Sequence, residues 1–294
     1  IRRSRVAVAA RRNRAEGRGT QWSFFVKSTI ILVVLVFVGR AHEVVPGVPT
    51  IPIGNLVVLA AAAGLALGGY LKRLPLLYRT PQLRLAFLLL LVAFATIPFA
   101  LWPGGATSTW ISVAKLWTIC IIIPLAAVTT RQLSIVTKTF AVASALLVAG
   151  YVLENLLGVP NFTARQSLGF DRNDVSLFAA MGIPYALAWA APGSRGRFFG
   201  IGLAGFLVIG IIATGSRGGF LAMAAVGAVF LLRSKLLDWP KKVLVLAAAL
   251  GLSVFVGSGD YWQRISVVFS DPTQDYNFQA REGRIEIWKR GIGY

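Results

Sequence analysis

The sequence predicts an all-α membrane protein, and three observations lead to that class. Of its 294 residues, 56% are hydrophobic and only 14% are charged, whereas a soluble domain has about 25% charged residues. The apolar residues form long runs close to the length that a helix needs to cross a bilayer. The basic residues fall in short clusters between these runs. A water-soluble globular domain is therefore disfavoured.

About nine segments are apolar enough to form transmembrane helices, in which every backbone polar group pairs within its own segment. They cover residues 22–38, 53–71, 83–101, 110–128, 140–157, 175–191, 198–213, 220–232 and 243–256. Proline, glycine or charged residues bound each segment. The first is not expected to be a cleaved signal peptide, because the arginine-rich residues 1–21 precede it and no cleavage site follows it. The sequence therefore predicts a polytopic helix bundle.

The distribution of Lys and Arg predicts the orientation in the membrane. With a cytoplasmic amino terminus, the inner segments hold 19 Lys and Arg, and the outer loops before the last span hold four: Arg40, Arg165, Arg172 and Arg217. This asymmetry explains the net charge of +19 without nucleic acid as a partner. The basic tail is expected to be a topology signal, with contact to anionic membrane lipids as the alternative.

Three regions follow from this pattern. We expect a basic cytoplasmic tail at residues 1–21, a transmembrane helical domain at 22–256 and the start of a large external, periplasmic loop at 257–294. Because the chain opens on Ile1 and stops at Tyr294 within a patterned stretch, we interpret it as a truncated segment of a longer product.

Few residues offer metal or redox chemistry. The chain has one cysteine, Cys120, and one histidine, His42, which excludes a disulfide framework and sites rich in cysteine or histidine. We predict no metal and no cofactor. Lys115 and Glu154 fall within apolar runs, near the expected outer ends of their helices, so we expect their side chains to snorkel to the interface.

Arg217 is the first candidate for an anion-binding residue. It lies in Thr214-Gly215-Ser216-Arg217-Gly218-Gly219, where glycines let the backbone turn tightly and expose N–H groups. A guanidinium beside such donors suits phosphate, which arginine binds through two parallel hydrogen bonds. The alternative is a tight turn with an arginine that only anchors the interface.

The second candidate is the stretch from Arg281 to Trp288. As a helix, it would place Ile285, Trp288 and Ile292 on one face with Arg281 and Arg284 at the edge of that face. Such a helix could lie on the outer leaflet with two arginines at headgroup depth. A plain interfacial helix with a tryptophan anchor is the alternative.

Three motifs in the second half of the chain together resemble the O-antigen ligase and polymerase superfamily. They are Phe170-Asp171-Arg172-Asn173-Asp174, then Thr214-Gly215-Ser216-Arg217-Gly218-Gly219, then Arg284 with Trp288 four residues later. The first half of the chain is similar to the family only in its pattern of spans. The Thr-x-Ser-Arg-Gly element is the most specific of the three.

The resemblance implies a multi-pass glycosyltransferase of the bacterial inner membrane, in lipopolysaccharide biosynthesis. Such an enzyme moves a glycan from an undecaprenyl diphosphate carrier to a lipid or glycan acceptor at the outer face, without metal. Its diphosphate-binding residues would be Arg217, Arg284 and Arg281, supported by Ser216, Gly218, Asn173 and Trp288. Arginines fit this role because the leaving diphosphate gains charge in the transition state.

One departure concerns the catalytic base. The family places a histidine beyond the Arg-x-x-x-Trp element, and this chain ends before that point, so no catalytic residue is assigned within it. His42 matches no family motif. A non-catalytic structural subunit of a larger complex, or a transporter, is the alternative function; a transporter would use ionisable residues near the bilayer midplane.

Overall fold

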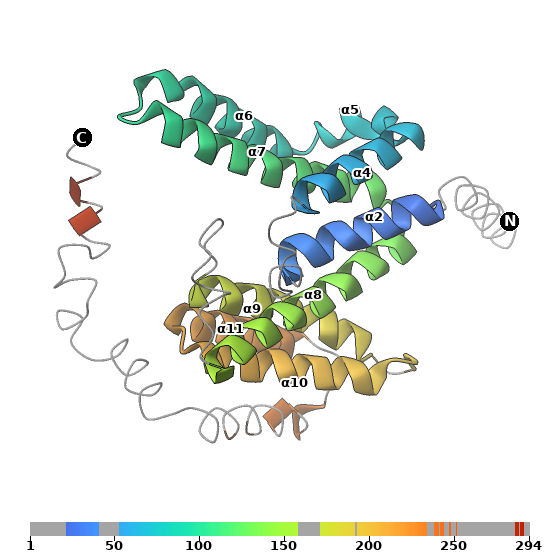
Figure 1. Ribbon diagram of the computed structural model, residues 1–294. Coiled ribbons are helices and arrows are strands. Elements are labelled where there is room, and N and C mark those ends of the chain that lie inside the picture. The colour runs from blue at the N-terminus through green and yellow to red at the C-terminus, as the bar shows by residue number, and fades with distance from the viewer. Residues whose placement is uncertain are drawn as a thin grey trace, which may run out of the picture. The chain divides into compact units, whose positions relative to one another are not determined.

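The protein is described from a computed structural model, which is helical and contains no strand within the residues it describes (Figure 1). These residues are 22–40, 53–157, 171–191, 193–233, 238–240, 242–243, 247, 251, 286–287 and 289–290. The predicted all-α class is confirmed. The chain divides into two units, residues 1–143 and 144–294, and each is described by itself.

Eight of the nine predicted segments coincide with a described helix. These are α2 (Phe24–Val34, continued by the π-helical turn η1, Leu35–Gly39), α4 (Ile53–Leu67), α6 (Pro81–Ala95), α7 (Pro103–Ala126), α8 (Thr130–Leu157), α9 (Arg172–Trp189), α10 (Arg197–Thr214) and α11 (Arg217–Arg233). The ninth segment lies mostly outside the described residues, as do the predicted tail at 1–21 and most of the predicted loop at 257–294.

Length and composition single out fewer helices as membrane spans. Among the described residues, four qualify alone: α6 with its 3-10 extension η4 (Ile97–Phe99), α7, α8 and α10. A bent pair that begins with α4 makes a fifth when it counts as one span, whereas α2 with η1 and α11 are apolar but shorter. The membrane character is thus clear, and four or five spans meet this criterion within the described residues.

The first unit has its core where α2 packs against α4 and α7. Val26 and Ile30 of α2, Leu65 of α4 and Ile122 of α7 are buried there. Gly64 permits the close approach of α2 and α4, because a Cβ on it would lie 2.9 Å from the Phe25 ring. The close contact between α2 and α4 therefore depends on the lack of a side chain at Gly64.

The carboxyl end of α7 is held by side chains from two other segments. Trp22 donates from Nε1 to the Ala126 carbonyl at 2.8 Å, and Arg73 donates from Nη1 to the Leu125 carbonyl at 3.4 Å. The Arg73 guanidinium also lies over the Tyr70 ring, 4.9 Å from its centre. Because the last carbonyls of a helix lack partners within it, these contacts satisfy groups that would otherwise be costly to bury.

The apolar run at residues 53–71 led us to expect one straight helix. The structure instead shows a bent segment. α4 ends at Leu67, and the chain continues through η3 (Tyr70–Arg73) and α5 (Leu74–Leu77) at 83° to it. The bend lies at Gly68 and Gly69, and Gly69 has φ of +72°, a conformation that glycine adopts readily. The apolar composition alone did not reveal this break.

Two helices begin earlier than their apolar runs suggested. α7 starts at Pro103 rather than near 110, and the hydroxyl of Thr107 donates to the Pro103 carbonyl at 2.8 Å. α8 starts at Thr130 rather than at 140; the Thr129 hydroxyl accepts from the Gln132 N–H at 3.2 Å, and Gln132 Oε1 accepts from the Thr129 N–H at 3.0 Å. This is a capping box, so polar residues here begin a helix.

Aromatic side chains join α6 to α7 as a hairpin. Trp110 donates from Nε1 to the Leu90 carbonyl at 2.9 Å, and its ring lies 5.1 Å from that of Phe94. Closer to the other end, the rings of Phe87 and Trp117 lie 5.3 Å apart. One face of α7 is thus committed to α6.

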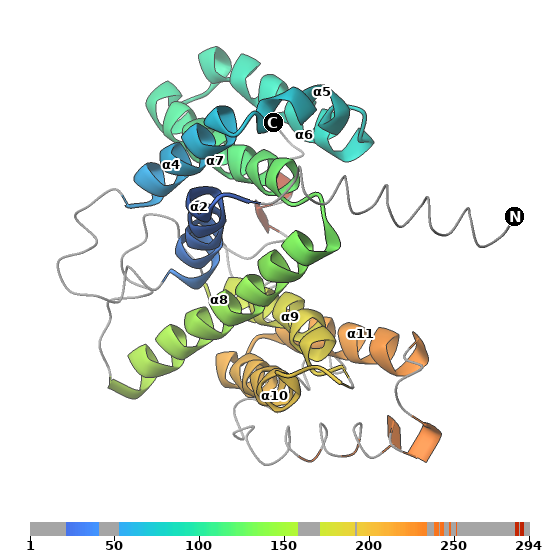
Figure 2. The ribbon, with the colours of Figure 1, turned by 90° about the vertical axis from the view of Figure 1, so that its right-hand side faces the viewer.

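In the second unit, α9 packs against both α10 and α11 (Figure 2). Gly200 and Gly210 of α10 allow close packing, because an added Cβ would lie 2.7 Å from the Ala186 carbonyl oxygen at Gly200 and would collide with Val148 at Gly210. Gly202 and Gly205 on the same helix face open space. Only some of the α10 glycines therefore serve helix contact.

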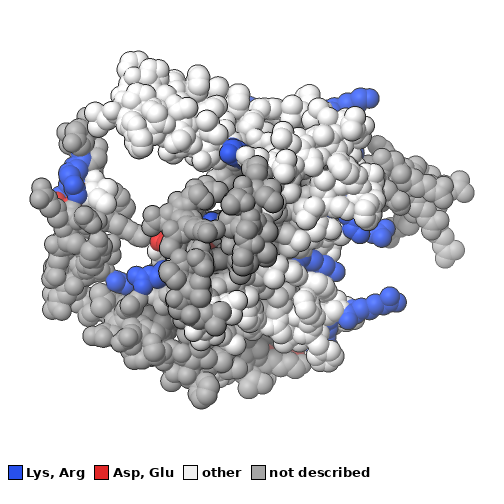
Figure 3. Space-filling model, in the orientation of Figure 1, with Lys and Arg blue, Asp and Glu red and all other residues white. Residues whose placement is uncertain are grey.

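Basic groups dominate the charged surface of the described residues. Figure 3 shows Lys and Arg side chains projecting from a mostly uncharged surface, with few acidic groups on this face. The sequence contains no Asp or Glu between Glu43 and Glu154. The basic side chains of that long segment therefore have no carboxylate within the segment to pair with.

Candidate functional site

The first motif forms the start of α9, where Asp171 is the N-cap, a position that Asp commonly occupies. Its carboxylate accepts from the backbone N–H of Asn173 at 2.7 Å and of Asp174 at 3.0 Å. Asp174 Oδ2 accepts in return from the Asp171 N–H at 3.0 Å. Asp171 Oδ2 also accepts from Asn173 Nδ2 at 2.9 Å, which fixes the Asn173 amide with its Oδ1 available to another partner.

The second motif forms a two-residue turn between α10 and α11. Gly215 ends α10 with φ of +61°, and its N–H donates to the Ile212 carbonyl at 3.0 Å. Ser216 then caps α11, because its Oγ accepts from the Gly219 N–H at 3.0 Å. The predicted tight turn at these glycines is therefore present, with left-handed geometry at Gly215 alone.

A hydrogen bond joins the two motifs. Ser216 donates from Oγ to Asn173 Oδ1 at 2.8 Å. Three residues further along each helix, a Cβ on Gly219 would lie 2.5 Å from Cβ and Oγ of Ser176. Both contacts join residues that are 43 apart in the sequence. Two such contacts at equal separation mean that α9 and α11 run parallel, with their amino termini side by side.

This arrangement concentrates positive potential at one end of the unit. Each helix amino terminus carries the equivalent of about half a positive charge, although Asp171 and Asp174 offset that of α9. Arg217, half-buried, is the first residue of α11. Gly218 beside it is exposed, and among the described residues no acceptor contacts its N–H. A guanidinium and an exposed N–H at a helix start suit an oxyanion.

Four basic residues are expected in the outer loops of the protein, and the structure describes three of them. Arg217 and Arg172 lie at the starts of α11 and α9, so both are at the same end of the second unit. Arg40 is buried in the first unit, where it follows η1 with φ of +47°. Arg165 lies outside the described residues.

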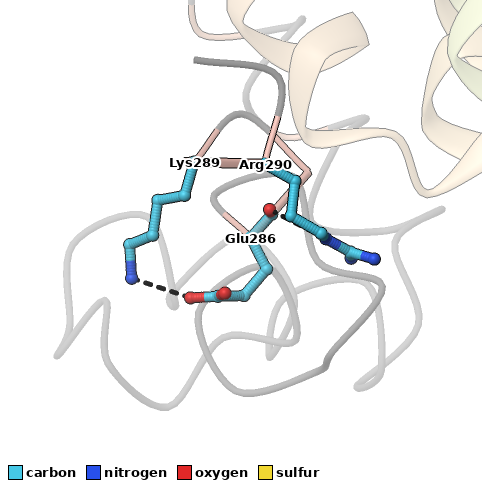
Figure 4. A network of polar contacts seen from close by, with 3 residues as sticks. All are labelled: Glu286, Lys289 and Arg290. Carbon is cyan, nitrogen blue, oxygen red and sulfur yellow. Dashed lines mark hydrogen bonds and ion pairs between the residues drawn. The ribbon is translucent and has the colours of Figure 1, made fainter. Parts of the chain in front are cut away.

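The third motif lies largely outside the described residues, including Arg281, Arg284 and Trp288. Its described part is helical, and Lys289 Nζ lies 2.7 Å from Glu286 Oε1 (Figure 4). Arg290 donates from Nε to the Glu286 carbonyl at 3.2 Å. The hydrogen bond from Lys289, and then its charge, lower the pKa of Glu286 below its ordinary value.

Two residues of this site are missing from the sequence-based set of candidates. Asp171 orients the Asn173 amide, and Ser176, fully buried, contacts Gly219. A matched spacing in the sequence could have indicated Ser176. It follows Asn173 by three residues, just as Gly219 follows Ser216 by three residues. Within the described residues, no group of three or more His, Cys, Asp or Glu side chains could hold a metal ion.

A family model matches part of the second unit. The family model described as O-antigen ligase matches residues 202–294, a range that includes most of α10, the turn at Gly215 and all of α11. This match confirms the resemblance drawn from the three motifs. No curated protein and no solved structure matches the chain.

Proposed function

We propose that this chain, an O-antigen ligase/polymerase-like membrane glycosyltransferase by its family match at residues 202–294, takes its glycan from an undecaprenyl diphosphate carrier. Transfer would go to a lipid or glycan acceptor at the outer face of the bacterial inner membrane, with the amino terminus in the cytoplasm. The observation that carries this proposal is the 2.8 Å hydrogen bond between Ser216 and Asn173, because it sets Arg217 beside two helix amino termini.

Arg217 would bind the diphosphate of the carrier. Its planar guanidinium can make two parallel hydrogen bonds to phosphate oxygens, and the neighbouring Gly218 N–H can donate a third. When the bond between the sugar and the diphosphate breaks, negative charge grows on the leaving oxygen. Donors that are already oriented stabilise that charge without further reorganisation. The same contacts therefore bind the substrate and lower the barrier.

Ser216 and Asn173 act through Arg217 and are positioning residues. Ser216 fixes the first turn of α11 through the Gly219 N–H and fixes α11 against α9 through Asn173. Arg284, with Arg281 beside it, would meet the same diphosphate from the segment after residue 257, and Trp288 would anchor that segment at the interface. The family resemblance supports these assignments.

The test is glycan transfer in membranes that contain the full-length protein, with the carrier-linked glycan and acceptor supplied. Arg217→Ala should lower the transfer rate by about 10²–10³, the usual cost of losing one preorganised oxyanion contact. Arg217→Lys keeps the charge but loses the planar fork and should also be strongly impaired. Arg195→Ala, an exposed arginine in the loop before α10, is the matched control and should retain the rate.

Two results would contradict the proposal. Near-normal transfer by Arg217→Ala would leave that residue as an interfacial anchor only. Absence of transfer by the full-length wild-type protein, with intact expression, would favour a structural subunit or a transporter. A double variant of Arg217 and Arg284 should lose less than the product of the single losses, because both act on one group.

A further inference from the structure

Most described basic residues of the first unit gather around the carboxyl end of α7. Trp22, just before α2, and Arg73 of η3 both bond to the last carbonyls of α7, and α8 begins four residues after α7 ends. The start of α6 lies at the same end, because α6 and α7 pair in opposite directions through Phe87 with Trp117 and Phe94 with Trp110. Six of the nine described Lys and Arg residues of the unit therefore share this end: Lys27, Lys72, Arg73, Arg79, Arg84 and Arg131.

No described carboxylate of this unit balances the charge. Its sequence holds two, Glu16 and Glu43, and both fall outside the described residues. Arg73 is half-buried and engages the Leu125 carbonyl and the Tyr70 ring. Three exposed cations remain whose side chains make no hydrogen bond or ion pair with another described residue: Lys72, Arg79 and Arg84.

Exposed leucines lie beside these cations. Leu71, 49% exposed, precedes Lys72 directly, and Leu76, 63% exposed, lies three residues before Arg79. The next helix, α6, belongs to a candidate membrane span and exposes several large apolar side chains: Leu85, Leu88, Leu89 and Leu91. In a membrane protein, lipid covers such a surface. A neighbouring segment that carries both leucines and cations matches the lipid interface, where apolar side chains enter the acyl region and basic ones meet the headgroups.

We propose that residues 70–84, which we call the basic elbow, bind an anionic phospholipid. The three exposed cations meet the headgroup phosphate, and Leu71 and Leu76 enter the acyl region. Charge complementarity selects an anionic headgroup, and the exposed leucines select a lipid over a free phosphate. Arg73 holds the elbow against α7, so a fixed segment presents the cations. Each cation near an anionic surface strengthens binding by about fivefold, and three together by on the order of a hundredfold.

Photocrosslinking in vesicles tests this binding. The full-length protein is reconstituted in phosphatidylcholine that contains a trace of either phosphatidylglycerol or phosphatidylcholine with the same diazirine, placed near the carbonyl of one acyl chain. Mass spectrometry should locate at least about tenfold more phosphatidylglycerol than phosphatidylcholine on residues 70–84. Phe99 and Leu101, exposed at the opposite end of the α6–α7 hairpin, are the internal reference, and both probes should label them equally.

Two matched triple variants isolate the role of charge. Lys72→Arg with Arg79→Lys and Arg84→Lys keeps all three charges and should leave the labelling of the elbow unchanged. Replacement of the same three residues by glutamine should lower phosphatidylglycerol labelling at least about tenfold, to the level of the phosphatidylcholine probe.

Four results would overturn the proposal. The two probes could label the elbow of the wild-type protein equally, or the glutamine variant could keep its labelling. An excess of glycerol phosphate could abolish the labelling, which would identify a free phosphate as the ligand. Neither probe could label the elbow while Phe99 and Leu101 react, which would show that a protein segment covers it.

Discussion

Substitution of Gly219 by alanine tests the contact that sets the spacing of α9 and α11. The new Cβ would lie 2.5 Å from both Cβ and Oγ of Ser176, and 3.2 Å from Ile211 Cγ2. The Ser176 Cβ is attached directly to the α9 backbone and cannot rotate away, so the two helices must separate. Such overpacking costs about 1–3 kcal/mol, and we expect Gly219→Ala to destabilise the protein.

Gly218→Ala provides a matched control one residue away. A Cβ there meets only Ser216 Oγ, at 3.8 Å, so only the gain in helix propensity remains, about 0.5–1 kcal/mol in favour of alanine. Because this gain is common to both variants, their unfolding free energies should differ by the packing cost alone, about 1–3 kcal/mol.

The assay is thermal unfolding of the full-length protein in lipid nanodiscs, followed by circular dichroism. Ser176→Gly removes the side chain that the new methyl group meets, so Gly219→Ala should cost much less in that background, as a double-mutant cycle would show. The reasoning is refuted if Gly219→Ala is as stable as Gly218→Ala, or if its cost is the same with and without the Ser176 side chain.

Three further predictions concern the capping, the orientation and the third motif. Asp171→Ala should destabilise the protein by about 1 kcal/mol in the same unfolding assay, because it removes the N-cap of α9; no loss of stability would contradict that role. In a background without the native cysteine, Gly218→Cys should react with a membrane-impermeant maleimide in intact cells and Arg195→Cys only after permeabilisation, and the reverse pattern would invert the predicted orientation. The pKa of Glu286 is depressed by Lys289, so the contribution of this pair to local helicity is present above pH 4.5 and is lost as pH falls through the folded pKa. Its carboxyl carbon resonance should titrate at a lower pH than in Lys289→Gln, and equal midpoints would show that the pair does not form.

The sequence predicted the helices well wherever burial in lipid dictates composition. Long apolar runs located eight described helices, because a membrane span must be apolar along most of its length. The starts of α7 and α8 were displaced because their first turns carry hydroxyl groups bonded to the helix backbone, as at Thr107. Composition counts such residues as polar. The bend after α4 depends on one left-handed glycine, which apolar periodicity does not register.

Local features of the candidate site follow from the sequence, but their arrangement does not. Asp171 as a cap follows from local preference, and the turn at Gly215 follows from the glycine content of its motif. The Ser216 to Asn173 hydrogen bond spans 43 residues and depends on how α9 and α11 align, which no local pattern encodes. The convergence of Arg217 with Arg284 lies outside the described residues and stays a prediction.

The contacts at the carboxyl end of α7 have a consequence for how this helix can move along its own axis. A slide of one helical turn would move α7 by about 5.4 Å along its axis. Trp22 and Arg73 hold the Ala126 and Leu125 carbonyls, so such a piston movement would break both hydrogen bonds and leave the carbonyls without donors. These two contacts therefore fix the position of α7 along its axis relative to Trp22 and Arg73.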